Sequence, residues 1–196
     1  MKILTVHGSP DREGNSAKLL NACIAGMKEV AGTKIESINI YDYHVEPIWK
    51  DYFGDVMKKT TDRIKDDMPT LRNKMDVADI IVLASPIYWY QLSGKTKLFL
   101  DRWTDFMNPD WSTGLKGKGL AVLSTHSGLN VMNSSDFLHL AMSTTATFLG
   151  MNWMGAVSGR AKMPWGWDDE LSVEQAKHFG KKLAQGINLI GQKVVL

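Results

Sequence analysis

The sequence predicts a single α/β domain in which a five-stranded parallel sheet is covered by helices on both faces. Short runs rich in Val, Ile and Leu alternate along the chain with longer segments of helical periodicity. One run, DIIVLA, is continuously apolar, as is typical of a strand buried on both faces. No repeat, low-complexity tract or linker divides the 196 residues, so we expect one domain over 1–196.

The first two strands are expected at 2–6, a β-branched and leucine run, and at 34–40, where apolar and polar residues alternate. A helix over 16–30 joins them, since its apolar residues recur every three or four positions. The stretch 41–67, rich in Tyr, Trp and Asp, is expected to be irregular or weakly helical. A short helix at 68–77 then leads into the third strand, DIIVLA.

The second half of the chain repeats the alternation. A helix is expected over 93–107, followed by a strand at 119–125 and a helix over 134–149. A fifth strand at 152–157 and a last helix over 172–189 complete the pattern. Strands that alternate with helices in this way imply parallel pairing through helical crossovers.

Composition indicates an ordinary cytoplasmic chain and excludes several kinds of partner. Hydrophobic residues make up 44% and charged residues 22%, and the net charge is +2 without a basic block. Neither a nucleic acid nor a membrane is therefore an expected partner, and the N-terminal apolar run is too short for a signal peptide. Cys23 is the only cysteine, which rules out an internal disulfide and leaves no cysteine set for a metal cluster.

Three of the five strands end in loops of unusual composition. HGSPDREGNS follows the first strand, SPIYWYQLSGK the third and STHSGLN the fourth. Because the carboxyl ends of parallel strands share one edge, these loops are expected to meet where such sheets bind ligands. Neither GxGxxG nor GxxxxGK[ST] occurs in the first loop, so it does not have the pattern of a dinucleotide or nucleoside triphosphate site.

The first loop contains the donors of a phosphate site. Ser9 offers a hydroxyl group, and two glycines allow the backbone to approach an anion closely. Asn15 and Ser16 stand at a helix N-terminus, where free N–H groups and the helix dipole favour an anion. Ser16 is equally well explained as a simple N-cap, and Arg12 as a solvated charge.

The loop after the third strand is rigid and aromatic. Pro86 is followed by Tyr88, Trp89 and Tyr90, which in most proteins would be buried in a core or an interface. At the end of a strand they also suit a planar ligand stacked on the loop, with backbone groups reading the edge of a heteroaromatic ring. The Asp-Arg pair at 101–102, in the helix that follows, is better explained as a structural ion pair or cap than as chemistry.

Three segments resemble one known family. GSPDREGNSAKLL, DDMPTLRNKMDVADIIVLASPIYWYQLSGKTKLFLDR and THSG are similar to the flavodoxin-like NADPH-dependent FMN reductases, closest to the iron–sulfur flavoprotein branch. The resemblance runs from residue 2 to about residue 160. It implies a flavodoxin-like three-layer sandwich with FMN as cofactor and NAD(P)H as co-substrate. Its motifs would place the FMN phosphate on Ser9, Arg12, Asn15, Ser16 and Ala17. The flavin ring would lie along Pro86, Ile87, Tyr88 and Trp89, with Thr125, His126, Ser127 and Gly128 beside it.

The chain departs from the iron–sulfur branch at one point. That branch carries a compact cluster of four cysteines between its second and third strands. The corresponding stretch here, YDYHVEPIWKDYFGDVMKKTTDRIKDDM, has no cysteine, so the resemblance implies a flavin-only enzyme. We expect the segment 41–53 to serve instead as a lid or a dimer contact.

The expected function is hydride transfer from NAD(P)H through bound FMN to a quinone, a flavin or a similar aromatic acceptor. The alternative is a one-electron flavodoxin-type carrier. Such carriers surround the flavin ring with acidic charge, and no acidic cluster follows the third or fourth strand here. The resemblance and the aromatic loop also suggest a homodimer or homotetramer. The sequence does not distinguish NADPH from NADH.

His126 has two explanations. In a loop at the end of a strand it could donate a proton to a reduced quinone or bind the pyrimidine edge of the flavin, which would make it catalytic. It could equally be a hydrogen-bonded structural residue. A serine hydrolase built on Ser124, His126 or Ser127 is disfavoured, because no G-x-S-x-G motif occurs.

Overall fold

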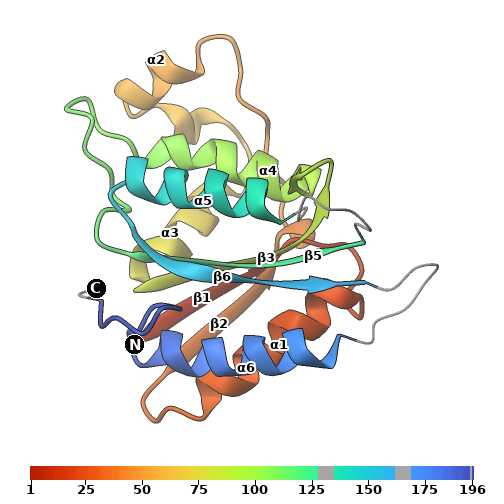
Figure 1. The fold of residues 1–196 in the computed structure, drawn as a ribbon. Helices are drawn as coiled ribbons and strands as arrows, with labels where there is room; N and C mark the ends of the chain where they lie inside the picture. Colours follow the sequence, from red (N-terminus) through yellow and green to blue (C-terminus); the bar gives the residue numbers. More distant parts are fainter. Residues whose placement is uncertain (128–134, 162–168, 195) are drawn as a thin grey trace.

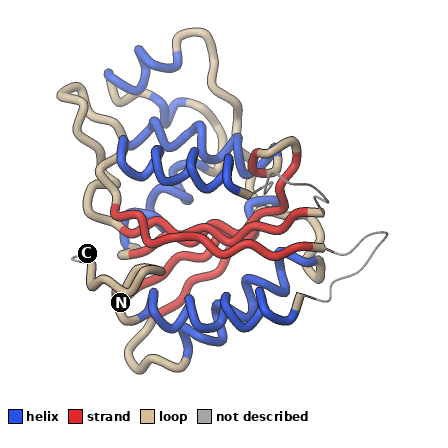
Figure 2. Tube along the Cα trace, in the orientation of Figure 1, coloured by secondary structure: helices blue, strands red, loops and turns tan. Residues whose placement is uncertain are grey.

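The computed structural model describes residues 1–127, 135–161, 169–194 and 196, which form a sheet between two helical layers (Figures 1 and 2). The strands are Lys2–His7 (β1), Lys34–Asn39 (β2), Ile80–Tyr88 (β3), Gln91–Leu92 (β4), Gly119–His126 (β5) and Asn152–Arg160 (β6). The α-helices are Asn15–Lys28 (α1), Tyr52–Met57 (α2), Met68–Val77 (α3), Gly94–Asp101 (α4), Asp136–Phe148 (α5) and Glu170–Ala184 (α6). Short 3₁₀ helices are Ile40–Asp42 (η1), Thr61–Arg63 (η2) and Arg102–Phe106 (η3). No helix in these ranges is long and apolar enough to cross a membrane.

The sheet has the strand order β2-β1-β3-β5-β6, and all neighbouring pairs in this path are parallel. This confirms the predicted five-stranded parallel sheet and its flavodoxin-like arrangement. One strand was not predicted: β4 pairs antiparallel with the end of β3, through Tyr88 and Gln91. The chain reverses there after only two residues, so the aromatic loop is a β-hairpin.

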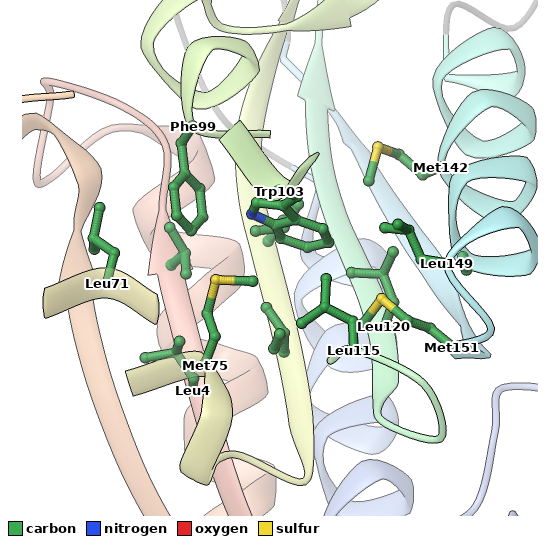
Figure 3. Packing of buried hydrophobic residues seen from close by; sticks show 14 of the residues in the cluster. Leu4, Leu71, Met75, Phe99, Trp103, Leu115, Leu120, Met142, Leu149 and Met151 are labelled. Carbon is green, nitrogen blue, oxygen red and sulfur yellow. The ribbon is translucent and has the colours of Figure 1, made fainter. Parts of the chain in front are cut away.

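The core lies on both faces of the sheet. Helices α1 and α6 cover one face, and α3, α4 and α5 cover the other, with α2 beyond them (Figure 1). On the second face, Trp103 lies at the centre of the packing, between Met75 of α3 and Met142 of α5, with Phe99 beside it (Figure 3). Burying such aromatic and aliphatic side chains is the main source of stability for a sheet of this kind.

Two predicted helices end earlier than expected, each for a local reason. The helix predicted over 93–107 changes to the 3₁₀ helix η3 at Arg102, whose guanidinium bonds the Asp105 carboxylate three residues on, at 3.0 Å. The helix predicted over 172–189 ends at Ala184, because Gly186 adopts a left-handed conformation (φ 67°) and closes a Schellman motif.

The free edge of β6 is partly covered by the turn that follows α6. The amide of Leu189 donates to the carbonyl of Met154 at 2.7 Å, at a bulge in β6. Gly155, with φ 110°, leaves room for the Leu189 side chain, which would lie 2.5 Å from a Cβ at that position. Covering an edge strand in this way protects it from pairing with other chains.

Candidate functional site

The three strands that lead into the unusual loops end side by side at one edge of the sheet, as predicted. β1 and β3 pair up to His7 and Ala84, and β3 and β5 pair up to Pro86 and Thr125. The chain therefore leaves β1, β3 and β5 at neighbouring positions of the sheet. This is the edge at which parallel α/β sheets bind their ligands.

The first loop is held against α4 and the third strand. The amide of Gly8 donates to the carbonyl of Ala84 at 2.6 Å, and Ser93 Oγ donates to the carbonyl of Gly8 at 2.6 Å. A Cβ on Gly8 would lie 2.2 Å from Thr96 Oγ1, so only glycine fits here. Gly8 therefore serves the packing of strand against helix, whereas the sequence had suggested close approach of the backbone to an anion.

The N-terminus of α1 has no side-chain cap. Gly14 occupies the N-cap position and has no side chain that could cap the helix. The first turn contains no acidic residue. The expectation that Ser16 is the N-cap is therefore wrong, because the helix begins one residue before it, at Asn15. The first-turn N–H groups and the helix dipole remain available to an anion.

Two serines add hydroxyl donors to these backbone groups. Ser9 Oγ accepts a hydrogen bond from the amide of Asp11 at 3.2 Å, and Ser16 Oγ lies 3.2 Å from His7 Nε2. Arg12 is placed differently from the expectation: its exposed guanidinium forms an ion pair with Asp42 rather than turning into the loop. The donor set that fits a phosphate group is thus two hydroxyl groups and the amides of an uncapped helix.

Sequence reasoning missed two residues beneath this loop. Asn39, at the end of β2, donates from Nδ2 to the carbonyl of Ser9 at 2.9 Å and to His7 Nδ1 at 3.1 Å. Burial, reinforced by the nearby Arg12 charge, lowers the pKa of His7 below its ordinary value. A polar residue ending a strand was the one available signal for Asn39, and it is a weak one.

The aromatic hairpin presents its side chains to solvent. Trp89 is 93% exposed, and Tyr88 and Tyr90 are also exposed, as the homodimer prediction had assumed. Trp89 (φ 51°) and Tyr90 (φ 65°) both adopt the left-handed conformation, which two-residue hairpin turns require and which bulky residues rarely accept. Residues held in such strained conformations cluster at functional sites. The Tyr90 ring also makes an edge-on contact with Phe137 of α5, at 5.6 Å.

The end of β5 lies next to this hairpin. Thr125 is buried, His126 is half-buried and Ser127 is exposed, while the predicted site residue Gly128 lies outside the described residues. His126 Nδ1 is buried and has no hydrogen-bond partner within the part of the chain that the structure describes. Burial and the charge of Arg160 lower the pKa of His126.

Ser124 does not fit the role of a hydrolytic serine. Ser124 is fully buried, and its Oγ lies 3.0 Å from His139 Nε2 and donates to Ser158 Oγ at 3.0 Å. Burial lowers the pKa of His139. The pair ties β5 to α5 and β6, and no substrate can reach its hydroxyl group.

The segment 41–67 is anchored by a buried arginine of η3. Arg102 binds the carboxylates of Asp66 and Asp105, and Tyr52 donates to Asp105 at 2.6 Å. Arg102 is thus in a structural ion pair as predicted, although Asp101 pairs with Lys97 instead.

Nothing in the described ranges resembles a metal or cluster site. Among those residues, no group of three or more His, Cys, Asp or Glu side chains could hold a metal ion. Cys23 lies in α1, where burial raises the pKa of its thiol to about 12. A surface hollow of about 700 Å³ between β6 and α6 is charged at its rim, with Lys177 and Glu29 paired at 2.8 Å, and it lies outside the three loops.

Comparisons with known proteins identify the family of this chain. A profile of the family described as NADPH-dependent FMN reductase matches residues 1–159. The chain is 26% identical to an iron–sulfur flavoprotein of Methanocaldococcus jannaschii, over 97% of this chain and 99% of that protein. It is 27% identical to a Bacillus subtilis protein named as an NAD(P)H-dependent FMN-containing oxidoreductase, over 84% and 87% of the two chains. Its fold matches that of an NAD(P)H:quinone oxidoreductase from Methanothermobacter marburgensis, with a TM-score of 0.69, 18% identity, and coverage of 93% of this chain and 98% of that one.

Proposed function

This chain belongs to the NADPH-dependent FMN reductase family, and on that premise we propose that it reduces a quinone, a flavin or a similar aromatic acceptor. It is an oxidoreductase whose cofactor is FMN and whose co-substrate is NAD(P)H. For a quinone, the balanced reaction takes NAD(P)H, one proton and the quinone to NAD(P)⁺ and the hydroquinone. When bound, FMN supplies the hydride-accepting and hydride-donating chemistry, and the protein binds and orients it.

The observation that carries the proposal is the uncapped N-terminus of α1 beside the loop after β1. We assign the FMN phosphate to the hydroxyl groups of Ser9 and Ser16 and to the first-turn amides of Asn15, Ser16 and Ala17. An anion at this position receives both hydrogen bonds and the favourable end of the helix dipole. Arg12 would join the set only by leaving Asp42, so it contributes least.

The ring of the flavin is assigned to the two loops beside the phosphate site. Pro86, Ile87, Tyr88 and Trp89 would line one side of the ring, and Thr125, His126, Ser127 and Gly128 the other. The β3–β5 pairing that ends at Pro86 and Thr125 supports this arrangement. Trp89 and Tyr90, held outward by the hairpin turn, would form the walls of a pocket for planar substrates.

His126 is proposed to act as the catalytic proton donor or to bind the pyrimidine edge. Its buried Nδ1 has no partner in the described part of the chain, so this nitrogen can exchange a hydrogen bond with a ligand. Its lowered pKa keeps the ring neutral near neutral pH, with one N–H to donate and one nitrogen to accept. A His126→Gln variant that kept full kcat with quinones would exclude the proton-transfer role.

We propose a homodimer or homotetramer in the cytoplasm. Supporting the assembly, the exposed face of α5 carries Phe137, Leu140 and Phe148, and no Lys, Arg, Asp or Glu occurs from 137 to 148. This uncharged face continues into Tyr90 of the hairpin. Sedimentation of a Leu140→Glu variant should show smaller particles than the wild type; a wild type that is monomeric at micromolar concentration with full activity would refute the assembly.

Steady-state kinetics with NADPH and NADH against a panel of quinone, flavin, azo and nitroaromatic acceptors tests the function. We expect turnover with at least one aromatic acceptor and bleaching of the bound flavin when NAD(P)H is added without air. If NAD(P)H fails to bleach the flavin and only one-electron partners exchange electrons with it, the protein is a flavodoxin-type carrier and the proposal fails.

A further inference from the structure

The buried pair of His7 and Asn39 lies directly beneath the proposed phosphate site. His7 Nε2 lies 3.2 Å from Ser16 Oγ, and His7 Nδ1 lies 3.1 Å from Asn39 Nδ2. Both side chains are buried, at the ends of the neighbouring strands β1 and β2. The three side chains thus form a short chain of hydrogen bonds that ends at the loop.

The direction of these hydrogen bonds follows from the backbone partners of Asn39. Its Nδ2 donates to the carbonyl of Ser9 at 2.9 Å, and its Oδ1 accepts from the amide of Tyr41 at 2.9 Å, so the amide cannot be flipped. The second hydrogen on Nδ2 must then be donated to His7 Nδ1. A neutral ring that accepts at Nδ1 carries its hydrogen on Nε2, and it donates that hydrogen to Ser16 Oγ.

We infer that His7 is a positioning residue for the phosphate site: it donates to the Ser16 hydroxyl and leaves the hydrogen of that hydroxyl free for the FMN phosphate. The inference rests on the assignment of the phosphate to Ser16 under the proposed function. Without this donor, no other side chain among the described residues would fix the orientation of the Ser16 hydroxyl. When His7 donates, the Ser16 oxygen accepts the hydrogen bond from His7, and the Ser16 hydrogen can be donated to the FMN phosphate.

The surroundings of His7 favour the neutral ring that the inference needs. A protonated ring would place a hydrogen on Nδ1 facing the Asn39 N–H group. Burial and the charge of Arg12 lower the pKa of His7, while Asp11 opposes this only weakly. The Ser16 hydroxyl has no acceptor among the described residues, so its hydrogen is available.

The test compares FMN with riboflavin, which has the same ring but no phosphate. Apoprotein is titrated with each, and the dissociation constants are read from flavin fluorescence for wild type, His7→Leu, Ser16→Ala and the double variant. His7→Leu and Ser16→Ala should each weaken FMN binding about tenfold or more, the worth of one hydrogen bond to a charged group, and leave riboflavin binding nearly unchanged. The double variant should be no weaker than Ser16→Ala alone, because the two changes remove one interaction.

Two further variants separate positioning from simple packing. His7→Gln, whose amide N–H reaches the position of Nε2, should restore most of the FMN affinity. His139→Leu removes a half-buried histidine that also lies against a serine, Ser124, and should leave the ratio of the two dissociation constants unchanged.

Each contrary result has a distinct meaning. If His7→Leu weakens riboflavin and FMN equally, His7 is only structural and the inference fails. If Ser16→Ala lowers FMN affinity but His7→Leu does not, the inference fails while the phosphate assignment stands. If Ser16→Ala has no effect, the inference fails and the phosphate is held by the backbone amides and Ser9 without the Ser16 hydroxyl group. Should His7→Leu not fold, the ¹⁵N shifts of the His7 ring in the wild type decide, since a hydrogen on Nδ1 would overturn the inference.

Discussion

Replacing Arg102 with methionine tests whether a buried ion pair holds the segment 41–67 to the domain. The Arg102 side chain is 1% exposed, as are the side chains of Asp66 and Asp105 that it binds. Methionine retains most of the volume and removes the charge. The two carboxylates would then be buried without a cation.

The structure sets the expected size of the effect. Burial works against the charge of Arg102, but its bonds to Asp105 and Asp66 more than offset this and raise its pKa. Its guanidinium carbon also lies 5.3 Å from the centre of the Trp49 ring and 5.7 Å from that of Tyr52. Removing one partner of a buried pair costs about 3–5 kcal/mol. At about 2–4 °C per kcal/mol for a domain of this size, Tm should fall by roughly 6–20 °C.

Urea unfolding followed by circular dichroism measures this cost. Both proteins should be unfolded with the same excess of FMN, because bound cofactor adds stability of its own. Lys97→Met is the matched control: it breaks the Lys97–Asp101 pair, whose side chains are 44% and 38% exposed, and should cost no more than about 1 kcal/mol.

A combined variant distinguishes charge from packing. Adding Asp66→Asn and Asp105→Asn to Arg102→Met should recover part of the lost stability, because the carboxylates no longer need a partner. A loss below about 1 kcal/mol in Arg102→Met, or no recovery in the combined variant, would refute the view that buried charge anchors this segment.

Four further results are expected. Replacing Asn15 and Ser16 together with alanine should weaken FMN binding about tenfold or more, the worth of the Ser16 hydroxyl group, because the backbone amides of both residues remain; an unchanged affinity by calorimetry would show that the phosphate does not use that hydroxyl group. Burial lowers the folded-state pKa of His7 and His139 below the unfolded value of 6.5, so the unfolded chain binds more protons and stability should fall as pH drops below that value. Urea midpoints at about pH 7.5 and pH 5.5 check this, and equal midpoints would contradict it. Trp89→Gly should leave stability unchanged or raise it by up to about 1 kcal/mol, since the left-handed strain is relieved, while KM for planar substrates rises. NAD(P)H and a planar acceptor would share the one open face of the bound flavin, so they must bind in turn. Double-reciprocal plots should then give parallel lines; intersecting lines would show that both substrates bind together.

Local pattern was sufficient for the architecture. The continuous apolar run at the start of β3 and the three-to-four spacing in α1 are properties of neighbouring residues, so the strands, the helices and their alternation could be predicted. The meeting of the three strand ends also followed, because parallel strands must present their carboxyl ends at one edge. The same logic predicted where the loops after β1 and β3 begin.

Helix and turn ends were less predictable, because single contacts decide them. The hydrogen bond from Arg102 to Asp105 tightens the end of α4, and the left-handed Gly186 stops α6. A two-residue turn made of Trp89 and Tyr90 runs against the usual preference for glycine and asparagine, so no local rule predicts that hairpin.

The contacts that specialise the site belong to the tertiary structure alone. Asn39 meets His7 across 32 positions of the chain, and Arg102 meets Asp66 across 36. Periodicity predicts which face of an element is buried, but it does not predict which polar groups meet there, and buried polar groups must find partners wherever the fold brings them. The sequence by itself therefore determined the fold and which strand ends lie together at one edge of the sheet, whereas the partners of His7, Ser16 and Arg102 were decided by the packing of distant strands and helices.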